Sequence, residues 1–580
     1  MDNLNITTPP TPKGSPFALG KGDFVSPADG GVCIEFDSHV PEDRLQSWPM
    51  VYVLTNEHEA YVGQTTSVAR RMTQHGANPE KKSFTTANVI YNEEFNASVV
   101  TDYEHRLIDL MQGDMKFRLT NRNGGMTPTN YFSRERYAQM FQELWDELRD
   151  VQLVQHSIEE IEQSEAFKFS PFKVLNADQE VAIQNILAAI DERLRDSDKT
   201  KTSAIVVEGM PGTGKTVLAI SLLKTLKDLA ADDNPDHTQF HEVNVKLLEP
   251  VTGLRQTVKR ALKKTVNLQA NDVMGPMDLR KPEFGHLQDG KGFDVLLVDE
   301  AHKLGLRKNM PPLQYKNYDA VTDALGLPYA APQLDWVLDQ ARVVVFFYDP
   351  LQSTGPKCIG DDLMRDRLGL AMNKRIQLKS QMRVKGGNGY LQYVRDLLFD
   401  VPVKQKTFKD YGFVLHEDFA EFEECFESTL AKHSLTRMVA GFAWEWKTKD
   451  NKNPGSFDIE IDGVQKRWNR TFRDWVGKGA DNPQTAREVG CIHSIQGYDL
   501  THAFVIIGRD LRYSSITGQL FVERGSYFDI NGKRGATDAQ LNQYVRNIYY
   551  VLLTRGIDST HVYVCDEALR KHLAQFLTIA

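Results

Sequence analysis

The stretch with the clearest chemistry is GMPGTGKT at 209–216, which fits the pattern G-x-x-x-x-G-K-[ST]. The glycines Gly209, Gly212 and Gly214 let consecutive backbone N–H groups converge on phosphate oxygens. Lys215 is expected to reach the β- and γ-phosphates, and the Thr216 hydroxyl to ligate Mg²⁺. The sequence therefore predicts a site for a nucleoside triphosphate such as ATP together with Mg²⁺.

The neighbouring elements fit that prediction. Apolar residues at 204–207 predict a buried strand before the loop, and helical spacing over 217–229 predicts a helix after it. A second buried strand is predicted at 295–298, and Asp299 and Glu300 follow its carboxyl end, where parallel α/β sheets place their sites. Asp299 is expected to hold Mg²⁺, and Glu300 to orient the attacking water.

A second group of reactive residue types lies nearer the N-terminus. MVYVLTN at 50–56 and AYVG at 60–63 predict the two strands of a hairpin. Helical patterns follow at 65–75 and at 102–111. The candidate chemical groups on these four elements are Tyr52, Tyr61, Arg71, His75 and Glu104.

These residue types suit the hydrolysis of a phosphodiester. A hairpin tyrosine, assisted by His75, can help to remove the proton of the attacking water. Arg71 can neutralise charge that develops on the phosphoryl group. Each residue alone also fits strand packing or a solvated surface, so the prediction depends on the combination.

The segment 48–132 resembles the GIY-YIG nucleases. Val51 and Tyr52 stand for the first motif, the run YVG at 61–63 stands for the second, and Arg71 follows ten residues after Tyr61, at the place of that family's catalytic arginine. The resemblance implies that Glu104 binds the single divalent metal, Mg²⁺ (or Mn²⁺), which would supply a Lewis acid.

Two positions in this segment fit the nuclease pattern less well. Asn121 matches a downstream asparagine of the family, with Asn123 as its rival. Met50 stands where the first motif usually has glycine. The departure leaves open a second interpretation, a catalytically inactive DNA-binding module.

The run from about 175 to 580 resembles superfamily 1 helicases and, most of all, P-loop ATPases related to the helicase-like region of Schlafen proteins. The features that carry the resemblance are AGFAW at 440–444, VGCIHSIQGYDL at 489–500 and RNIYYVLLTRG at 546–556. It implies two RecA-like domains that hydrolyse ATP in the cleft between them.

The same resemblance implies further site residues. Gln179 would read the adenine base, Gln352 would sense the γ-phosphate, and Arg383 and Arg555 would reach the triphosphate from the second domain. The residues that would link bound nucleic acid to the ATP site are Gln496 and Gly497, beside His493.

One further segment, QKRWNRTFRDWVGKG at 465–479, interleaves basic and aromatic residues. It fits a stacking surface for a single strand. Trp468, Phe472 and Trp475 also fall at i, i+4 and i+7, which predicts a buried helical stripe. The buried helix is the favoured interpretation.

Composition limits the classes of protein that fit. A chain of 580 residues with 41% hydrophobic and 25% charged residues is ordinary for a multidomain globular protein, and a net charge of −9 confines any nucleic-acid surface to a local patch. Five scattered cysteines without a C-x-x-C pair argue against a disulfide framework or a cysteine-rich zinc site. No apolar run approaches a membrane span, so a cytoplasmic protein is expected.

The predicted fold class is α/β multidomain, with a small α/β GIY-YIG domain and two RecA-like parallel-sheet domains. The predicted boundaries are a flexible N-terminal arm at 1–46, the nuclease domain at 47–132, a helical connector at 133–172, the first RecA-like domain at 173–355 and the second at 356–580, with loop-bearing insertions at 447–463 and 509–540.

The predicted function is an ATP-dependent nuclease–helicase, with DNA favoured over RNA as its partner. The fusion implies nucleic-acid processing in repair, mobile-element biology or defence against foreign DNA, which is an inference by association. An alternative is a motor that does not unwind and instead acts as an ATP switch that gates the nuclease. The oligomeric state cannot be read from the sequence.

Overall fold

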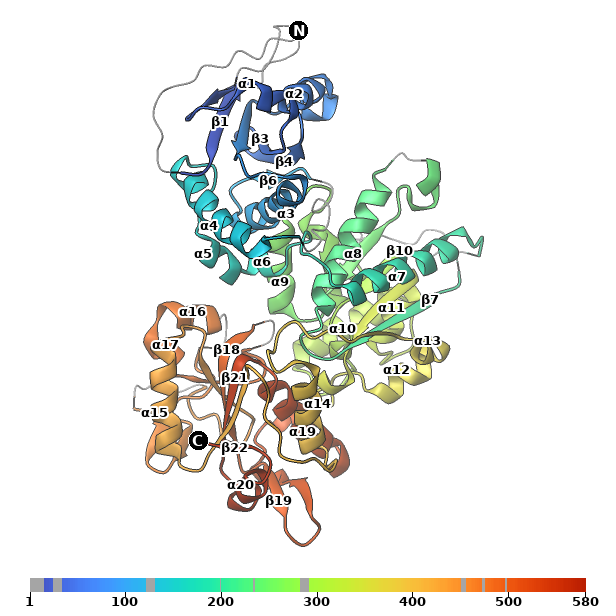
Figure 1. The fold of residues 1–580 in the computed structure, drawn as a ribbon. Coiled ribbons are helices and arrows are strands. Elements are labelled where there is room, and N and C mark those ends of the chain that lie inside the picture. Colours follow the sequence, from blue (N-terminus) through green and yellow to red (C-terminus); the bar gives the residue numbers. More distant parts are fainter. Residues whose placement is uncertain are drawn as a thin grey trace. The chain divides into compact units, whose positions relative to one another are not determined.

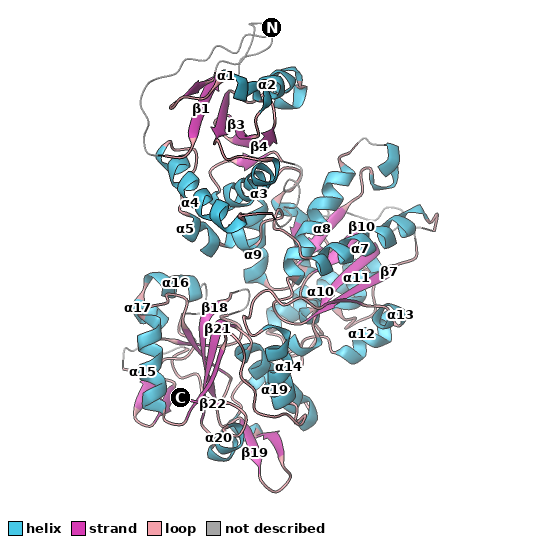
Figure 2. Cartoon of the chain, in the orientation of Figure 1, coloured by secondary structure: helices cyan, strands magenta, loops and turns pink. Residues whose placement is uncertain are grey.

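The computed structural model describes residues 15–23, 34–121, 131–198, 200–232, 235–281, 292–449, 455–471, 475–495 and 498–580. The chain divides into two compact units. The first comprises Met1–Leu175, Ile220–Val243 and Gln256–Val273, and the second comprises Asn176–Ala219, Asn244–Arg255 and Met274–Ala580. Their helices and strands are drawn in Figure 1 and coloured by type in Figure 2. In the part of the chain that is described, no helix combines the length and apolar character needed to cross a membrane.

The first unit contains a six-stranded sheet with the order β2-β1-β5-β3-β4-β6. Its strands are β1 (Ala18–Asp23), β2 (Glu35–Phe36), β3 (Met50–Thr55), β4 (Glu59–Thr65), β5 (Thr86–Tyr91) and β6 (Arg118–Leu119). Strands β3 and β4 pair antiparallel as the predicted hairpin, which is therefore confirmed.

The predicted flexible arm does not extend over the whole of 1–46. Strand β1 pairs antiparallel with β5 along its full length, from Ala18 opposite Tyr91 to Asp23 opposite Thr86. Phe17, Ile34 and Phe36 are buried in the same unit. Burial of these apolar side chains stabilises the segment in the sheet. The sequence prediction missed the strand because the residues before it are rich in proline.

The helices of the first 175 residues, in the ranges that the structure describes, are α1 (Glu42–Ser47), α2 (Val68–Ala77), α3 (Ala97–Asp114), α4 (Arg134–Asp150), α5 (Ile158–Gln163) and α6 (Glu165–Lys168). The predicted stripe on α4, from Tyr137 through Phe141 and Leu144 to Leu148, is buried in one core with strand residues such as Val53. The segment predicted as a connector is therefore packed as part of this unit, because its apolar face needs the sheet to cover it.

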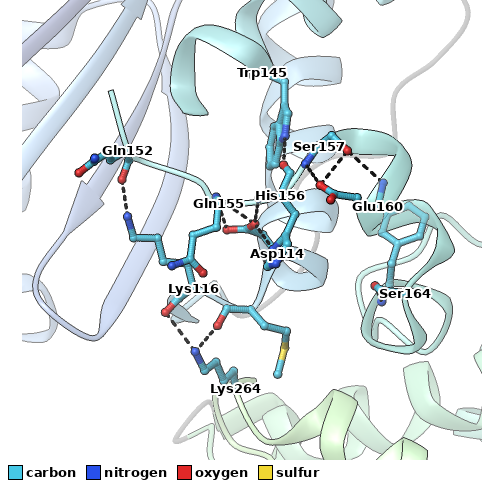
Figure 3. A network of polar contacts seen from close by, with 12 residues as sticks. Asp114, Lys116, Trp145, Gln152, Gln155, His156, Ser157, Glu160, Ser164 and Lys264 are labelled. Atoms are coloured by element: carbon cyan, nitrogen blue, oxygen red, sulfur yellow. Dashed lines mark hydrogen bonds and ion pairs between the residues drawn. The ribbon is translucent and has the colours of Figure 1, made fainter. Parts of the chain in front are cut away.

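A buried carboxylate ends α3 and holds the segment after α4 against it (Figure 3). Asp114 accepts hydrogen bonds from the backbone N–H groups of Gln155 (3.0 Å) and His156 (2.8 Å), and the His156 ring lies 3.0 Å from the same oxygen. Lys264 donates to the backbone carbonyls of Met115 and Lys116, just past the end of α3. The negative end of the α3 dipole favours this lysine.

The second unit contains two sheets. The first has the order β12-β7-β11-β10-β8-β9, and β12, β7, β11, β10 and β8 pair parallel. Its strands are β7 (Ser203–Gly209), β8 (Val245–Leu248), β9 (Val273–Met274), β10 (Phe293–Val298), β11 (Ala341–Tyr348) and β12 (Ile376–Leu378). The helices along this part of the chain are α7 (Ala177–Arg195), α8 (Lys215–Ala230), α9 (Thr252–Leu262), α10 (Pro312–Ala324), α11 (Gln333–Gln340), α12 (Asp361–Leu368) and α13 (Leu370–Asn373). The larger parts of α8 and α9, from Ile220 and from Gln256, belong to the first unit. The strands and helix predicted around the phosphate loop are confirmed.

The second sheet has the order β17-β14-β18-β21-β13-β22, with parallel pairing throughout. Its strands are β13 (Gly412–His416), β14 (Arg437–Ala440), β17 (Val489–Gly490), β18 (Leu500–Ile507), β21 (Gly556–Val564) and β22 (Thr578–Ile579). The helices are α14 (Gly387–Leu398), α15 (Phe419–Leu430), α16 (Trp475–Asp481), α17 (Pro483–Ala486), α18 (Ile530–Lys533), α19 (Asp538–Leu553) and α20 (Glu567–Leu573). Two parallel sheets flanked by helices, beside the mixed sheet of the first unit, confirm the α/β multidomain class.

The buried helix predicted over 465–479 is wrong for the first part of that segment, and only its end is helical, in α16 from Trp475 onward. The segment begins in strand β16 (Val464–Lys466), which pairs antiparallel with β15 (Ile459–Ile461), and Trp468 bridges to Val489. Phe472 lies outside the described residues. Trp468 and Trp475 are both buried, as the favoured interpretation required, but in two different cores. Each tryptophan satisfied the helical spacing by coincidence.

The two predicted insertions contain ordered hairpins as well as loops. Strands β15 and β16 form one of them. The other joins β19 (Leu511–Ser514) to β20 (Gln519–Val522), with Gly518 in the left-handed region (φ +70°) between them. The turn-forming residues of these segments predicted the loops, but they gave no signal for the short strands beside them.

Candidate functional site

The phosphate loop connects β7 to α8, as the pattern predicts. Gly212 (φ +81°) and Gly214 (φ +75°) both adopt the left-handed region. A Cβ on Gly212 would also come within 2.2 Å of the Gln381 Oε1 atom. Only glycine therefore fits the loop at this position, for reasons of backbone conformation and of space.

Lys215 is buried and points back over the loop. Its Nζ atom donates to the Gly209 carbonyl (2.6 Å) and to the Met210 carbonyl (3.1 Å), and lies 3.6 Å from a carboxylate oxygen of Asp349. Asp349 in turn accepts a hydrogen bond from the Gln352 amide at 2.7 Å. The predicted γ-phosphate sensor thus reaches the phosphate-loop lysine through a single carboxylate.

Gln179 holds the loop from the start of α7. Its amide nitrogen donates to the carbonyls of Thr213 (3.1 Å) and Gly214 (3.4 Å), while its amide oxygen accepts from the Asn176 backbone N–H in a capping box. The residue is fully buried. These contacts give Gln179 a positioning role, and its contact with adenine stays a prediction.

Asp299 and Glu300 emerge from the end of β10 as expected. Burial and then the charge of Glu300 raise the pKa of Asp299, while the Thr216 hydroxyl acts to lower it. Glu300 sits at φ +44°, with a carboxylate oxygen 2.7 Å from the His302 imidazole. Burial opposes the ionisation of Glu300, but the contact with His302 brings its pKa below the ordinary value.

This arrangement suits a divalent cation. Both carboxylate oxygens of Asp299 are buried and, among the described residues, have no hydrogen bond of good geometry. A cation held between Asp299 and Thr216 would supply the missing charge compensation and lower the pKa of the carboxyl group. The residues predicted to hold Mg²⁺ at the triphosphate therefore fit that ion.

Two arginines from the C-terminal part of the second unit approach the same site. Arg383 forms an ion pair with Asp499. Burial, and then the charge of Arg383, lower the pKa of Arg555 to about 10, and Arg555 also interacts electrostatically with Glu300 and Asp349. These predicted arginines are brought together beside the carboxylates, whereas Gln496 and Gly497 lie outside the described residues.

The segment that contains Arg383 is hydrogen-bonded to the phosphate loop. The backbone N–H of Met382 donates to the Gly212 carbonyl (3.0 Å), and the Gln381 amide donates to the Pro211 carbonyl. The Ser380 backbone N–H donates to Asp178 at 2.9 Å. Gln381 and Asp178 are not part of the sequence prediction, because only their tertiary contacts reveal them.

The N-terminal hairpin gathers a second polar cluster. The hydroxyl of Tyr52 on β3 lies 2.7 Å from the His75 Nε2 atom and accepts a hydrogen bond from the Arg71 Nε–H group at 3.1 Å. The rings of Tyr61 and His75 lie 5.6 Å apart. Tyr52, Tyr61, Arg71 and His75 therefore meet at one place, as the sequence predicts.

The electrostatics of this cluster favour a neutral imidazole and two protonated phenols. Burial is the largest cause in each case: it raises the pKa of Tyr52 and of Tyr61, and it lowers the pKa of His75 to about 4. The charges of Arg71 and Lys81 contribute to the low value at His75. A neutral His75 in contact with the Tyr52 hydroxyl can accept its proton.

Glu104, on α3, interacts electrostatically with both tyrosines and with Arg71. Burial raises the pKa of Glu104 to about 7. A half-buried carboxylate whose charge is poorly compensated is a suitable ligand for a divalent cation, which would favour its ionised form. The residue predicted as the metal ligand therefore fits that role.

Two other hairpin residues have clear positioning roles. A Cβ on Gly63 would fall 2.3 Å from the Tyr52 hydroxyl oxygen, so glycine leaves the room that Tyr52 occupies. Asn121 accepts from the Val62 N–H (3.1 Å) and donates to the Val62 carbonyl (2.8 Å), like one more strand residue beside β4. Its rival, Asn123, lies outside the described residues.

Lys81 is a functional candidate that sequence reasoning missed. Its Nζ atom lies 3.3 Å from the centre of the Tyr61 ring. A cation over the ring face is attracted by the ring electrons and adds positive charge to the cluster. No local motif surrounds this lysine, so only the folding of 79–81 back onto β4 could identify it.

A cavity of about 990 Å³ opens in the second unit, between loops of the two parallel-sheet regions. One wall is aromatic, with the rings of Trp446 and Phe442 lying 5.8 and 5.5 Å from that of Trp468. Asp458 fixes this wall, since it accepts hydrogen bonds from the backbone N–H groups of Thr448 and Trp468, both at 2.8 Å. The lysines that line the cavity are Lys303, Lys357, Lys449 and Lys533.

Lys303 joins this cavity to the ATP site. Its Nζ atom donates to the backbone carbonyl of Gln352 (2.6 Å) and to the Thr354 hydroxyl (3.1 Å). Thr354 also lines the cavity. The segment that contains the predicted γ-phosphate sensor therefore forms part of the cavity wall, and Lys303 is a second residue that the sequence did not single out.

Comparison with known proteins identifies a matching family model, a related protein and similar solved structures. A family model described as "Schlafen group 3, DNA/RNA helicase domain" matches residues 202–566. The uncharacterized protein YPL245W of Saccharomyces cerevisiae is 23% identical over 432 residues, which cover 69% of this chain and 90% of that protein.

Similar solved structures include S. cerevisiae Dbp5 bound to RNA and ADP BeF3, with 11% identity, coverage of 70% of this chain and 94% of that chain, and a TM-score of 0.26. They also include the DUF1998 helicase MrfA bound to DNA and AMPPNP, with 10% identity, coverage of 69% and 49%, and a TM-score of 0.27.

Proposed function

Because the chain belongs to the Schlafen group 3 DNA/RNA helicase domain family and has a helicase-like ATPase fold, we propose that it is an ATP-driven enzyme that binds a nucleic-acid strand and cuts it. The ATPase site is built around Lys215, and the cutting site around Tyr52, Arg71, His75 and Glu104. DNA is the proposed substrate, and RNA is the competing one.

The observation that carries the motor assignment is the electrostatic interaction of Arg555 with Glu300 and Asp349, beside Arg383, which packs against the phosphate-loop residue Gly212. Arg555 directly precedes β21 of the second sheet, while Glu300 follows β10 of the first sheet. Arg383 lies between β12, an edge strand of the first sheet, and α14. Arginines that reach a triphosphate from another sheet make hydrolysis depend on the relative position of the two sheets. Hydrolysis can then be coupled to movement along a strand.

The aromatic cavity supports a nucleic-acid strand as the partner. Trp444 and Trp446, which are partly exposed in the cavity, offer faces on which bases can stack, and the lysines of the cavity can neutralise phosphates. The link from Lys303 to the backbone of Gln352 provides a path between an occupied cavity and the triphosphate.

The cutting site is proposed to hydrolyse a phosphodiester. The Tyr52 oxygen would accept a proton from the attacking water as its own hydroxyl proton passes to His75, and Arg71 would stabilise the charge on the phosphoryl oxygens. The water oxygen would bond to phosphorus, the P–O bond to the leaving oxygen would break, and the leaving oxygen would take up a proton from solvent. A divalent cation on Glu104 would supply Lewis-acid chemistry. Burial, and then the charges of Arg71 and Lys81, lower the pKa of His75 and keep its ring neutral, so that one ring nitrogen has a lone pair to accept the proton.

The decisive test compares the wild-type chain with Lys215→Ala and Glu104→Gln on labelled single-stranded, duplex and forked DNA and on RNA, with and without Mg²⁺ and ATP. We expect Lys215→Ala to lose ATP hydrolysis and to retain Mg²⁺-dependent cleavage, and Glu104→Gln to show the reverse. Wild-type protein that cuts none of these substrates with Mg²⁺ or Mn²⁺ would refute the nuclease.

A second candidate function keeps the same chemistry but replaces the motor by a switch. The contacts of 380–382 with the phosphate loop favour it, since triphosphate binding alone could rearrange them. A non-hydrolysable ATP analogue distinguishes the two, because translocation and strand displacement need turnover, whereas a switch needs only binding. Strand displacement with ATP but not with the analogue would exclude the switch.

A further inference from the structure

The second parallel sheet carries a cluster of nitrogen and sulfur groups that neither proposed site uses. His416 ends β13, His561 lies on β21, and Cys425 lies on α15, which packs on the same face of the sheet. One ligand atom from each residue can be chosen so that all three atoms lie within 4.8 Å of one another. We propose that His416, Cys425 and His561 form a zinc site that joins α15 to the sheet.

The separations suit a tetrahedral ion. The His416 Nε2 and His561 Nδ1 atoms lie 3.0 Å apart, and the Cys425 Sγ atom lies 3.9 Å from the same His561 nitrogen. Zinc bonds of about 2.0–2.1 Å to nitrogen and about 2.3 Å to sulfur place tetrahedral ligands roughly 3.3–3.6 Å from one another. Shifts of a few tenths of an ångström would therefore admit the ion.

The strands and the helix place all three side chains next to one another. Strands β13 and β21 are parallel neighbours, and their register places His416 beside Tyr563, two residues beyond His561 on the same face. Helix α15 covers that face, with Phe419, Phe422 and Phe426 buried against it. Cys425 on the same helix reaches the histidines beside this apolar contact.

An aromatic neighbour orients one of the three ligands. The His561 ring stacks on Phe504, at 4.4 Å and an interplanar angle of 3°, which fixes its orientation. Cys425 would release its thiol proton to solvent when its sulfur bonds to the ion.

The donor set selects the class of ion. Two imidazoles and a thiolate suit zinc, while Mg²⁺ and Ca²⁺ require oxygen ligands. The cluster is therefore chemically distinct from the Mg²⁺ sites proposed at Asp299 and Glu104. With three protein ligands, a water molecule would complete the tetrahedron.

The experiment uses the full-length chain stripped of metal, and titrates it with Co²⁺ and Zn²⁺. We expect Co²⁺ to give the visible bands of a tetrahedral site together with a sulfur-to-metal charge-transfer band, and one equivalent of Zn²⁺ to displace it and to raise Tm. Cys425→Ser should remove the charge-transfer band, whereas Cys565→Ser, at another cysteine beside the same core, should keep it.

Three results would overturn the proposal: a wild-type chain that binds no Co²⁺, a charge-transfer band that survives Cys425→Ser, or a band that disappears only in Cys565→Ser. His561→Gln supplies an independent check, since it should weaken Zn²⁺ binding while the thiol stays in place. Circular dichroism of each variant verifies the fold.

Discussion

The phosphate loop and the hairpin cluster differ in how their reactive side chains are held in place. Lys215 is held by carbonyls of its own loop and by Asp349, so the site is already partnered inside the protein. Tyr52, Arg71 and His75 instead come from a strand and a helix and depend on one another, beside a carboxylate of raised pKa. A local motif builds the first site, and packing of several elements builds the second.

This difference has a practical consequence for mutation. Damage to the triphosphate site should remove turnover and leave the hairpin cluster intact, because no residue belongs to both sites. Mutation of one residue of the hairpin cluster should disturb the others, because Tyr52, Arg71 and His75 orient one another through hydrogen bonds. Four predictions test this contrast, from the largest expected effect to the smallest.

The largest effect is expected for Arg383→Ala. Loss of an arginine that stabilises the transferring phosphoryl group should lower the ATP hydrolysis rate ~10³–10⁵-fold, while cleavage without ATP stays unchanged. Arg367→Ala is the matched control, because Arg367 is exposed and paired with Asp335. Steady-state phosphate release measures the effect, and full turnover in Arg383→Ala would remove this residue from the site.

The next effect is expected for Tyr52→Phe. Removal of the hydroxyl between His75 and Arg71 should lower cleavage about 10²–10⁴-fold and leave ATP hydrolysis unchanged. Tyr91→Phe, on β5 of the same sheet, is the control, because the Tyr91 hydroxyl has no hydrogen-bond partner among the described residues. Gel-based single-turnover cleavage measures both variants, and equal losses would argue for a packing role.

A smaller effect is expected for pH. The pKa of Glu104 is raised to about 7, so the ionised form that binds a cation accumulates as pH rises through that value, while His75, with a pKa of about 4, stays neutral. Between pH 6 and pH 8 the affinity of the cutting site for Mg²⁺ should rise roughly tenfold. Cleavage measured against Mg²⁺ concentration at each pH provides the test, and a pH-independent Mg²⁺ requirement would contradict it.

The smallest effect is expected for Gly63→Ala. The new methyl group would overlap the Tyr52 hydroxyl, and we expect a local destabilisation of about 1–3 kcal/mol. Hydrogen exchange over β3 and β4 reports this local loss. Gly253→Ala serves as the control, because nothing lies within 4 Å of the atom that it would add.

Much of the fold was predictable because the decisive signals are local. Apolar runs predicted the strand before the phosphate loop and the strand before Asp299, and the apolar stripe on α4 predicted its buried face. The predictions failed where contacts are distant in sequence. Strand β1 needs β5, some seventy residues away, and the spacing of Trp468 and Trp475 was helical although the two residues enter different cores.

The residues of the candidate sites also fall into those that a local motif predicts and those that only tertiary contacts reveal. The sequence by itself determined the residue types at the phosphate loop, because a run of eight residues fixes both the backbone and the chemistry. It also named the hairpin tyrosines and Glu104. Only the tertiary structure decided the contributions of Lys81, Lys303 and Gln381, and the meeting of His416, Cys425 and His561. A side chain's partners in space depend on packing, and packing leaves no fixed spacing in the chain.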